Sequence, residues 1–155
     1  MDFRNEPVRS IPKYREKRPN RKKKKLETFR GVTIPPKRVR GNISKKDYQE
    51  AIEAFGECCI ICNGYPIEMH HCTFRSKSGR SGYRNLAPLC REHHNLAHQK
   101  RKFADLLRDE REEMFGPFYA ADKWDLYKKN LIPNCTDEAY EKFMVAEEKK
   151  AAKND

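Results

Sequence analysis

Residues 90–98 read CREHHNLAH and place one cysteine and three of the chain's five histidines within nine positions. The packing of a surface helix does not require so many of these side chains. Three imidazoles this close would also repel one another if they were protonated together. The stretch therefore predicts metal ligands, and the residues around it indicate how these ligands divide.

Two pairs of ligands share the same short spacing. Cys59 and Cys62 are separated by two residues, and so are Cys90 and His93. Two such pairs, a few tens of residues apart, are typical of a tetrahedral structural zinc site. Such a site would matter here because short strands and a few helices bury a small core, and zinc binding adds folding free energy.

The remaining cysteines give no second set of pairs. No stretch has the apolar length of a membrane span or an export signal, so we expect an intracellular, cytoplasmic protein without membrane contact. Thiols stay reduced there, which favours metal ligands or free thiols over disulfides. Cys58 is an alternative to Cys59, although Cys59 gives the tighter spacing. We expect Cys72 and Cys135 to be packing residues or free thiols.

Four histidines are left after the zinc ligands are assigned. His94 and His98 are four residues apart, so on a helix they share one face and can bind one ion. His93 would point about 100° away from His94, toward the cysteine pairs. His70 and His71 are adjacent on an expected strand and should point to opposite faces. One of them can complete a three-histidine metal set, and the other is then available as a base.

The local signals predict an α+β chain with a ββα unit at its centre. Ser44 and Asp47 predict a helix start, and Gly56 can end that helix. Thr136 is expected to cap the last helix. Between them we expect, in chain order, a strand near residues 67–73, a loop at 75–84, a strand at 85–90, a helix from Arg91, helical structure over 102–115 and a short helix within 117–133. The pattern leaves open whether the structure over 102–115 continues the helix from Arg91 or begins after a bend.

The charge is unevenly distributed along the chain. Residues 1–46 hold 17 Lys/Arg against 4 Asp/Glu, and residues 67–103 hold 8 against 2. Five prolines interrupt residues 1–43, which we expect to form a disordered basic arm before a domain at 44–115 and a helical extension at 116–155. The arm predicts a nucleic-acid partner, with a solubilising tail as the alternative. Its KKKK at 22–25 fits phosphate binding and nuclear targeting equally well.

The segment at residues 70–98, HHCTFRSKSGRSGYRNLAPLCREHHNLAH, resembles the His-Asn-His (HNH) endonuclease motif, a ββα-metal fold. More particularly, it resembles the bacterial and phage group whose core is clamped by a zinc knuckle. The shared features are His-His on the first strand, Asn-Leu opening the second, Leu-Cys before the helix, and the helix histidines. The resemblance covers about residues 57–99. Related members often have four cysteines in the knuckle, whereas His93 stands at the fourth position here, and zinc accepts this set.

The substitution leaves two possible assignments of His93 and His94 to the two metals. The strand and helix directions favour His93 in the knuckle. The resemblance then implies that His70, His94 and His98 hold a catalytic divalent ion and that His71 is the general base, oriented by Asn85. Imidazole ligands favour Zn, Ni, Co or Mn, but the resemblance keeps Mg open, so the ion is undecided.

The implied reaction is hydrolysis of DNA, with double-stranded DNA expected, to a 5′-phosphate product. His71 would deprotonate water, and the ion would stabilise charge on the phosphate oxygens. We expect low sequence specificity, because the basic residues near the site are phosphate contacts rather than base readers. These residues are Arg75, Lys77, Arg80, Arg84 and Arg91.

Two other functions fit parts of the pattern. A non-catalytic, zinc-stabilised nucleic-acid-binding module explains the charge and the Cys/His pairs, but it gives no reason for the adjacent His70 and His71. The chain could also act inside a larger phage or recombination assembly whose partner supplies specificity. The sequence leaves the oligomeric state open.

Overall fold

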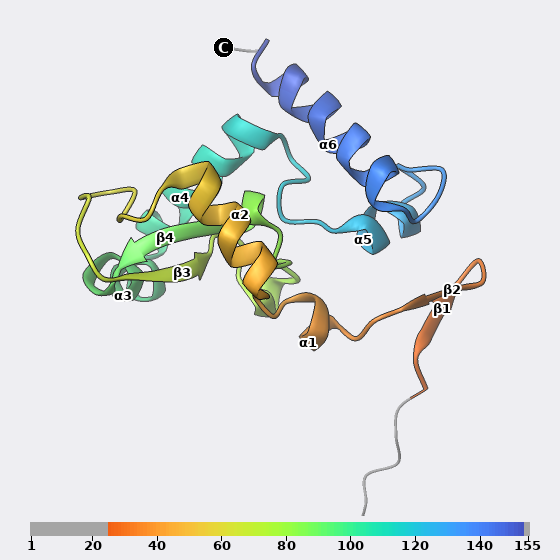
Figure 1. The fold of residues 1–155 in the computed structure, drawn as a ribbon, viewed down its shortest axis with the longest axis horizontal. Coiled ribbons are helices and arrows are strands. Elements are labelled where there is room, and N and C mark those ends of the chain that lie inside the picture. Colours follow the sequence, from red (N-terminus) through yellow and green to blue (C-terminus); the bar gives the residue numbers. More distant parts are fainter. Residues whose placement is uncertain (1–24, 154–155) are drawn as a thin grey trace, which may run out of the picture.

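The computed structural model describes residues 25–153, which contain helices and two small antiparallel sheets (Figure 1). The α+β prediction is confirmed at this level. The elements are β1 (Glu27–Phe29), β2 (Val32–Ile34), α1 (Lys37–Arg40), α2 (Lys45–Phe55), β3 (Ile67–His71), the 3-10 turns η2 (Arg75–Lys77) and η3 (Tyr83–Asn85), β4 (Leu86–Cys90), α3 (Arg91–Gln99), α4 (Arg101–Phe115), α5 (Lys123–Lys128) and α6 (Asp137–Ala151).

The central sheet pairs β3 with β4 in antiparallel register, with Ile67 opposite Cys90 and His71 opposite Leu86. Every residue of β4 is buried. Both α2 and α3 contact β4, and α2 crosses the sheet in Figure 1. A strand covered by neighbours on both faces can be apolar at consecutive positions, which accounts for the sequence LAPLC.

The helix starts follow from the expected capping residues. The Ser44 side chain accepts a hydrogen bond from the Asp47 amide, and the Asp47 carboxylate accepts one from the Ser44 amide at 2.9 Å. Gly56 ends α2 with a positive φ of 86°, a conformation that glycine adopts without strain. Thr136 caps α6 in the same way as Ser44 caps α2.

The helical conformation is interrupted between α3 and α4. Lys100 has φ −112° and ψ 106°, which is an extended conformation between two helices. The histidine-bearing helix therefore ends at Gln99, and α4 takes a new direction from Arg101. The short α3 positions the metal-ligating side chains, whereas α4 packs against α6.

The prediction of a disordered arm over residues 1–43 is wrong for its last part. Residues 25–43 contain the β1–β2 hairpin and α1, and residues 1–24 lie outside the described range. Phe29 packs edge-on against Tyr127 with ring centroids 5.5 Å apart, and the buried Arg40 pairs with Asp122 at 2.7 Å. Contacts far along the chain, invisible in the local sequence, therefore order this segment.

The helices after residue 116 have a small core of their own. Leu126, Ile132 and Met144 form a buried cluster, separate from the main core around β4 and α4. In Figure 1 the hairpin and α3 lie at opposite ends of the molecule. No helix within residues 25–153 is both long enough and apolar enough to cross a membrane.

Candidate metal centre and pocket

Cys59, Cys62, Cys90 and His93 converge on one point, with all four ligand atoms within 4.8 Å of one another. The Cys62 and Cys90 sulfurs are 3.7 Å apart, and the His93 Nδ1 lies 3.6 Å from the Cys59 sulfur. Zinc–sulfur bonds of about 2.3 Å in a tetrahedron place two sulfurs about 3.8 Å apart. The cluster therefore has the donor set and the spacing to hold a metal ion such as zinc, as the Cys/His pairs predicted.

Local backbone structure favours the metal-binding form of Cys59. Burial raises the pKa of the Cys59 thiol, but backbone amides of Cys90, Ile61 and Cys62 outweigh burial and lower that pKa to about 6. Amide groups aimed at the sulfur favour the thiolate, which is the form that binds metal. The second pair comes from the end of β4 and the first turn of α3.

The other cysteines lie outside this cluster. The Cys58 sulfur contacts Asn63 Oδ1 at 3.6 Å, so Cys59 rather than Cys58 is the converging residue. Cys72 is buried beside β4, and burial raises the pKa of its thiol to about 11 despite the nearby Arg111. Cys135 is a free thiol after α5. The packing or free-thiol expectation fits the positions of Cys72 and Cys135.

A second group brings together His70 from β3 with His94 and His98 from α3. Their ring centroids are 4.8–5.2 Å apart, and their ligand atoms also lie within 4.8 Å of one another. The buried His70 Nε2 has no hydrogen-bond partner within the described residues. Burial, followed by the charges of His94 and His98, lowers the pKa of His70 to about 3. The neutral His70 ring, with its unpartnered buried nitrogen and two further imidazoles beside it, fits a divalent cation.

Two further side chains brace this group. The Glu68 carboxylate contacts His94 Nδ1 at 3.1 Å, which leaves Nε2 of the same ring for a metal. Phe74 stacks on His98 with ring centroids 5.4 Å apart and planes 9° apart. The sequence analysis missed both residues. The position of Glu68 was a usable signal, because a residue two before His70 on a strand points to the same face.

His71 opens onto the same pocket as the three histidines. The pocket has a volume of about 330 Å³ and is lined by Met69, His70, His71, Phe74, Arg75, Ser76, His94 and His98. His70 and His71 were expected on opposite faces of the strand, with one as a metal ligand and the other free to act as a base, and both line this one pocket. β3 ends at His71, and the pocket reaches around that end of the strand.

The His71 side chain is held in a state suited to accept a proton. Burial and then the charge of Arg75 lower its pKa, while a hydrogen bond to the Gly41 backbone opposes them. Its Nε2 is buried and has no partner within residues 25–153. The ring is therefore neutral at pH 7, and one nitrogen is available. Gly41 lies far from His71 in the sequence, so no local pattern could have identified this contact.

Asn85 does not contact His71 by a hydrogen bond, contrary to the role that the family resemblance implied. Its Oδ1 accepts a hydrogen bond from the Thr73 amide at 2.7 Å, and its Nδ2 donates to the Thr73 and Arg80 carbonyls at 3.1 and 2.8 Å. Its own carbonyl accepts from the Cys72 amide. Asn85 thus closes the loop between β3 and β4 and fixes where β3 ends.

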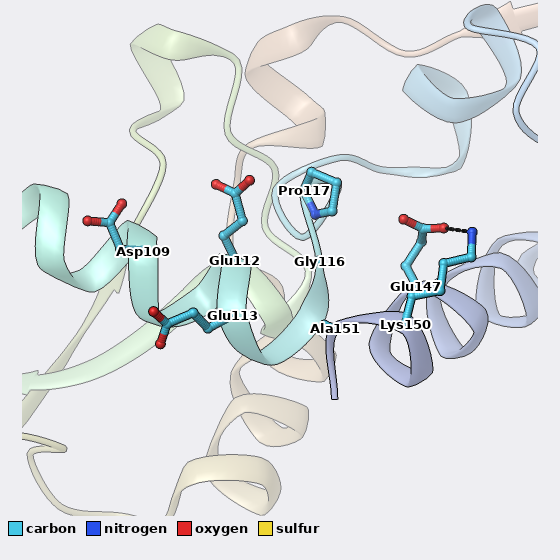
Figure 2. Close-up of a pocket in the computed structure, with 8 residues that line it drawn as sticks. All are labelled: Asp109, Glu112, Glu113, Gly116, Pro117, Glu147, Lys150 and Ala151. Carbon is cyan, nitrogen blue, oxygen red and sulfur yellow. Dashed lines mark hydrogen bonds and ion pairs between the residues drawn. The ribbon is translucent and has the colours of Figure 1, made fainter. Parts of the chain in front are cut away.

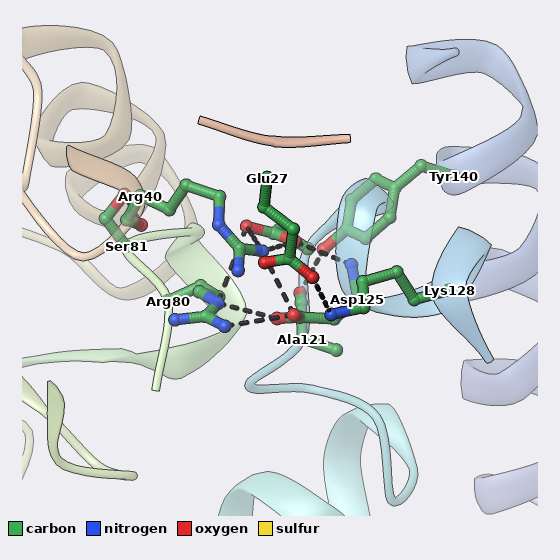
Figure 3. A network of polar contacts seen from close by, with 9 residues as sticks. Glu27, Arg40, Arg80, Ser81, Ala121, Asp125, Lys128 and Tyr140 are labelled. Atoms are coloured by element: carbon green, nitrogen blue, oxygen red, sulfur yellow. Dashed lines mark hydrogen bonds and ion pairs between the residues drawn. The ribbon is translucent and has the colours of Figure 1, made fainter. Parts of the chain in front are cut away.

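Two of the five expected phosphate contacts are structural residues instead. Arg80 and Arg84 are each only 3% exposed. Arg80 pairs with Asp125 at 2.6 Å, and Arg84 pairs with Glu148 at 2.6 Å. A guanidinium that is buried against carboxylates has no surface for a phosphate. Figure 3 shows Arg80, Arg40 and Asp125 converging from three parts of the chain.

The other three expected phosphate contacts are exposed. They are Arg75, Lys77 and Arg91. Arg75 lines the histidine pocket, where its Nη2 donates to Asn42 Oδ1 at 2.8 Å. Arg91 starts α3, which carries His94 and His98, whereas Arg75 and Lys77 belong to the η2 turn that follows β3.

An acidic pocket lies between the ends of α4 and α6. Asp109, Glu112 and Glu113 line it from α4, and Glu147 and Lys150 line it from α6, where they form an ion pair at 2.6 Å (Figure 2). Four carboxylates against one ammonium give this surface a net negative charge, which repels anions.

Comparison of the chain with protein-family models, with curated proteins and with solved structures found no match.

Proposed function

We propose that this protein is a metal-dependent endonuclease that hydrolyses DNA phosphodiester bonds with low sequence specificity. In this proposal β3, β4 and α3 form an HNH-type ββα-metal core, and the Cys59–His93 cluster holds a structural zinc ion. One observation carries the proposal: a neutral imidazole with an unpartnered nitrogen, His71, shares a pocket with three imidazoles that converge on one point.

The proposed chemistry assigns one task to each group. His70, His94 and His98 would hold a divalent cation, which supplies charge stabilisation at the phosphate oxygens when bound. His71 takes a proton from water through Nε2, while the Gly41 backbone holds the other side of the ring. The resulting hydroxide attacks phosphorus, and the bond to the 3′ oxygen breaks to leave a 5′ phosphate. Arg75 neutralises charge on the bound phosphate from the pocket wall.

Substitution of the base tests this assignment. His71→Ala should abolish nicking of a supercoiled plasmid in the presence of Mg²⁺, Mn²⁺, Ni²⁺, Co²⁺ or Zn²⁺, with a loss of at least 100-fold. Zinc content and DNA affinity should stay at wild-type values, because His71 belongs to neither metal group. Asn95→Ala, an exposed change on α3, is the matched control and should nick normally.

The outcomes separate the candidate functions. Cleavage that survives His71→Ala contradicts the assignment of the base. A wild-type protein that binds DNA but nicks no plasmid with any of these ions is instead the non-catalytic, zinc-stabilised binding module.

A further inference from the structure

A second pocket, next to the histidines, is rich in lysine. It has a volume of about 510 Å³, and its lining includes Lys37 from α1, Lys77 from η2, and Lys128 and Lys129 at the end of α5. All four side chains are exposed. We call it the lysine pocket. Its lining residues come both from the segment predicted to be a disordered arm and from the segment predicted to be a helical extension.

The charge of the lysine pocket is only partly compensated. Its lining holds four lysines with Arg40 and Arg80 against Glu27 and Asp125, a net charge of +4. Arg40 and Arg80 form ion pairs with Asp122 and Asp125. Figure 3 shows Glu27 and Lys128 beside this group, where they form an ion pair. Among residues 25–153, three lysines of the pocket have no carboxylate partner, namely Lys37, Lys77 and Lys129.

The lysine pocket and the histidine pocket meet at one turn of the chain. Ser76 lines the histidine pocket, and the next residue, Lys77, lines the lysine pocket. Consecutive Cα atoms are about 3.8 Å apart, and each DNA strand carries one phosphate per about 3.4 Å of helix axis. A strand with one phosphate at the histidines can therefore continue along η2 toward the lysine pocket.

We propose that the lysine pocket binds backbone phosphates of the nucleic-acid strand whose scissile phosphate lies at the three histidines. This inference rests on the proposed nuclease function and adds the surface that positions the substrate. Ammonium groups act as point charges, and the lining offers the hydroxyls of Thr73 and Ser78 but no set of base-reading side chains. Binding there is therefore independent of base sequence.

The salt dependence of DNA binding tests the lysine pocket. The full chain carrying His71→Ala, which prevents cleavage, is compared with the same chain that also carries K37Q, K77Q and K129Q. The probe is a fluorescein-labelled 20-base-pair duplex of arbitrary sequence, and anisotropy gives the affinity at several salt concentrations. A matched control carries K45Q, K142Q and K149Q, which remove the same charge from exposed positions on α2 and α6.

Loss of three phosphate contacts should reduce the slope of log K against log salt by about 2.7. The ratio of the DNA affinity of the chain with His71→Ala alone to that of the chain with the three added lysine substitutions should then fall about 40-fold between 50 and 200 mM salt. The control variant should keep the slope of the chain with His71→Ala alone. Zinc content and melting temperature, measured for both variants, establish that each is folded.

The two proposals fail in different ways. A pocket variant that is folded and keeps the control's slope overturns the lysine pocket, even if the wild-type protein cleaves DNA. A reduced slope, together with a wild-type protein that nicks no plasmid, supports the phosphate-binding pocket and overturns the hydrolytic function.

Discussion

Glu68 is the acidic residue whose carboxylate reaches the three-histidine group, through His94 Nδ1 at 3.1 Å. A carboxylate on the outer nitrogen of a ligating imidazole sets the orientation of the ring and increases its basicity. Glu68→Gln should therefore weaken divalent-metal binding at the three histidines by about 10- to 100-fold. Isothermal titration with Mn²⁺ or Ni²⁺ into zinc-loaded protein measures this affinity. Glu92→Gln, exposed on α3, is the control, and equal affinities of the two variants would contradict a supporting role for Glu68.

Asn85 is fully buried and makes three side-chain hydrogen bonds, all to the loop that follows β3. Asn85→Ala leaves backbone groups of Thr73 and Arg80 unpaired in the interior, so we expect a loss of about 2–4 kcal/mol in the free energy of unfolding. Denaturant unfolding of the zinc-loaded protein measures it.

The nicking activity of the Asn85→Ala variant distinguishes a role of Asn85 in the reaction from a role in closing the loop. A variant that keeps wild-type stability but loses nicking would place Asn85 in direct contact with the reaction, as the family resemblance implied. A destabilised variant that still nicks below its melting temperature supports the role in loop closure.

At the scale of elements, the turn between α2 and β3 has little apolar packing to hold it. Cys62 is exposed, and the turn around it buries little besides Cys59. If the cluster binds zinc as proposed, metal binding supplies much of the free energy that docks this turn onto the start of α3. Cys62→Ser should lower both the zinc content and the melting temperature, and a strong chelator should do the same to the wild-type protein.

Cys58→Ser is the matched control for the knuckle, because Cys58 is adjacent in sequence but outside the cluster. It should keep one zinc ion per chain and the wild-type melting temperature, as measured by elemental analysis and calorimetry. Equal losses in both variants would show that the turn depends on its thiols in general and not on one ligand set.

An element could be predicted from the sequence when the residues that determine it lie close to one another in the chain. The cap at Ser44, the cap at Thr136 and the two ligand pairs each depend on residues within four positions, so the sequence was sufficient. The β1–β2 hairpin, by contrast, is held by contacts with residues about 100 positions away, such as Glu27 with Lys128. Three-residue strands carry too few side chains to show a period of two.

The same distinction between local and distant contacts applies to the residues of the candidate site. Helix geometry was sufficient to predict that His94 and His98 share one face, whereas the choice of His70 over His71 as the third member came from the family resemblance. The partners of Arg80 and Arg84 could not, since a basic residue in a Gly/Ser-rich loop has the same local pattern whether it faces solvent or a distant carboxylate. Gly41 beside His71 is another contact of this kind.

At the scale of the whole molecule, one ion cluster joins three parts of the chain that are distant in sequence. Arg40 follows the hairpin, Arg80 belongs to the β3–β4 loop, and Asp125 lies on α5 (Figure 3). The same cluster forms part of the lysine pocket wall. The relative placement of hairpin, loop and α5 therefore determines whether the lysines face one strand of nucleic acid together.

Asp125→Asn tests this cluster through the pH dependence of stability. Burial raises the pKa of Asp125, but hydrogen bonds and charges from Arg80 and Arg40 outweigh it and hold that pKa below its ordinary value. A carboxyl with a lowered folded-state pKa stabilises the fold above its unfolded pKa of about 3.9, and this contribution is lost as the pH falls through the folded pKa.

We therefore expect Asp125→Asn to be less stable than wild type by about 1–3 kcal/mol at pH 7. The gap should narrow as the pH falls from about 4 through the folded-state pKa, because the unfolded wild-type chain takes up a proton at Asp125 before the folded chain does. Urea unfolding at pH 7, 5 and 3 measures the gap, with Asp109→Asn on the exposed face of α4 as the control. A gap that stays constant over this range would mean that Asp125 contributes by shape and hydrogen bonding alone. The hairpin, the loop and α5 would then be held together without its charge.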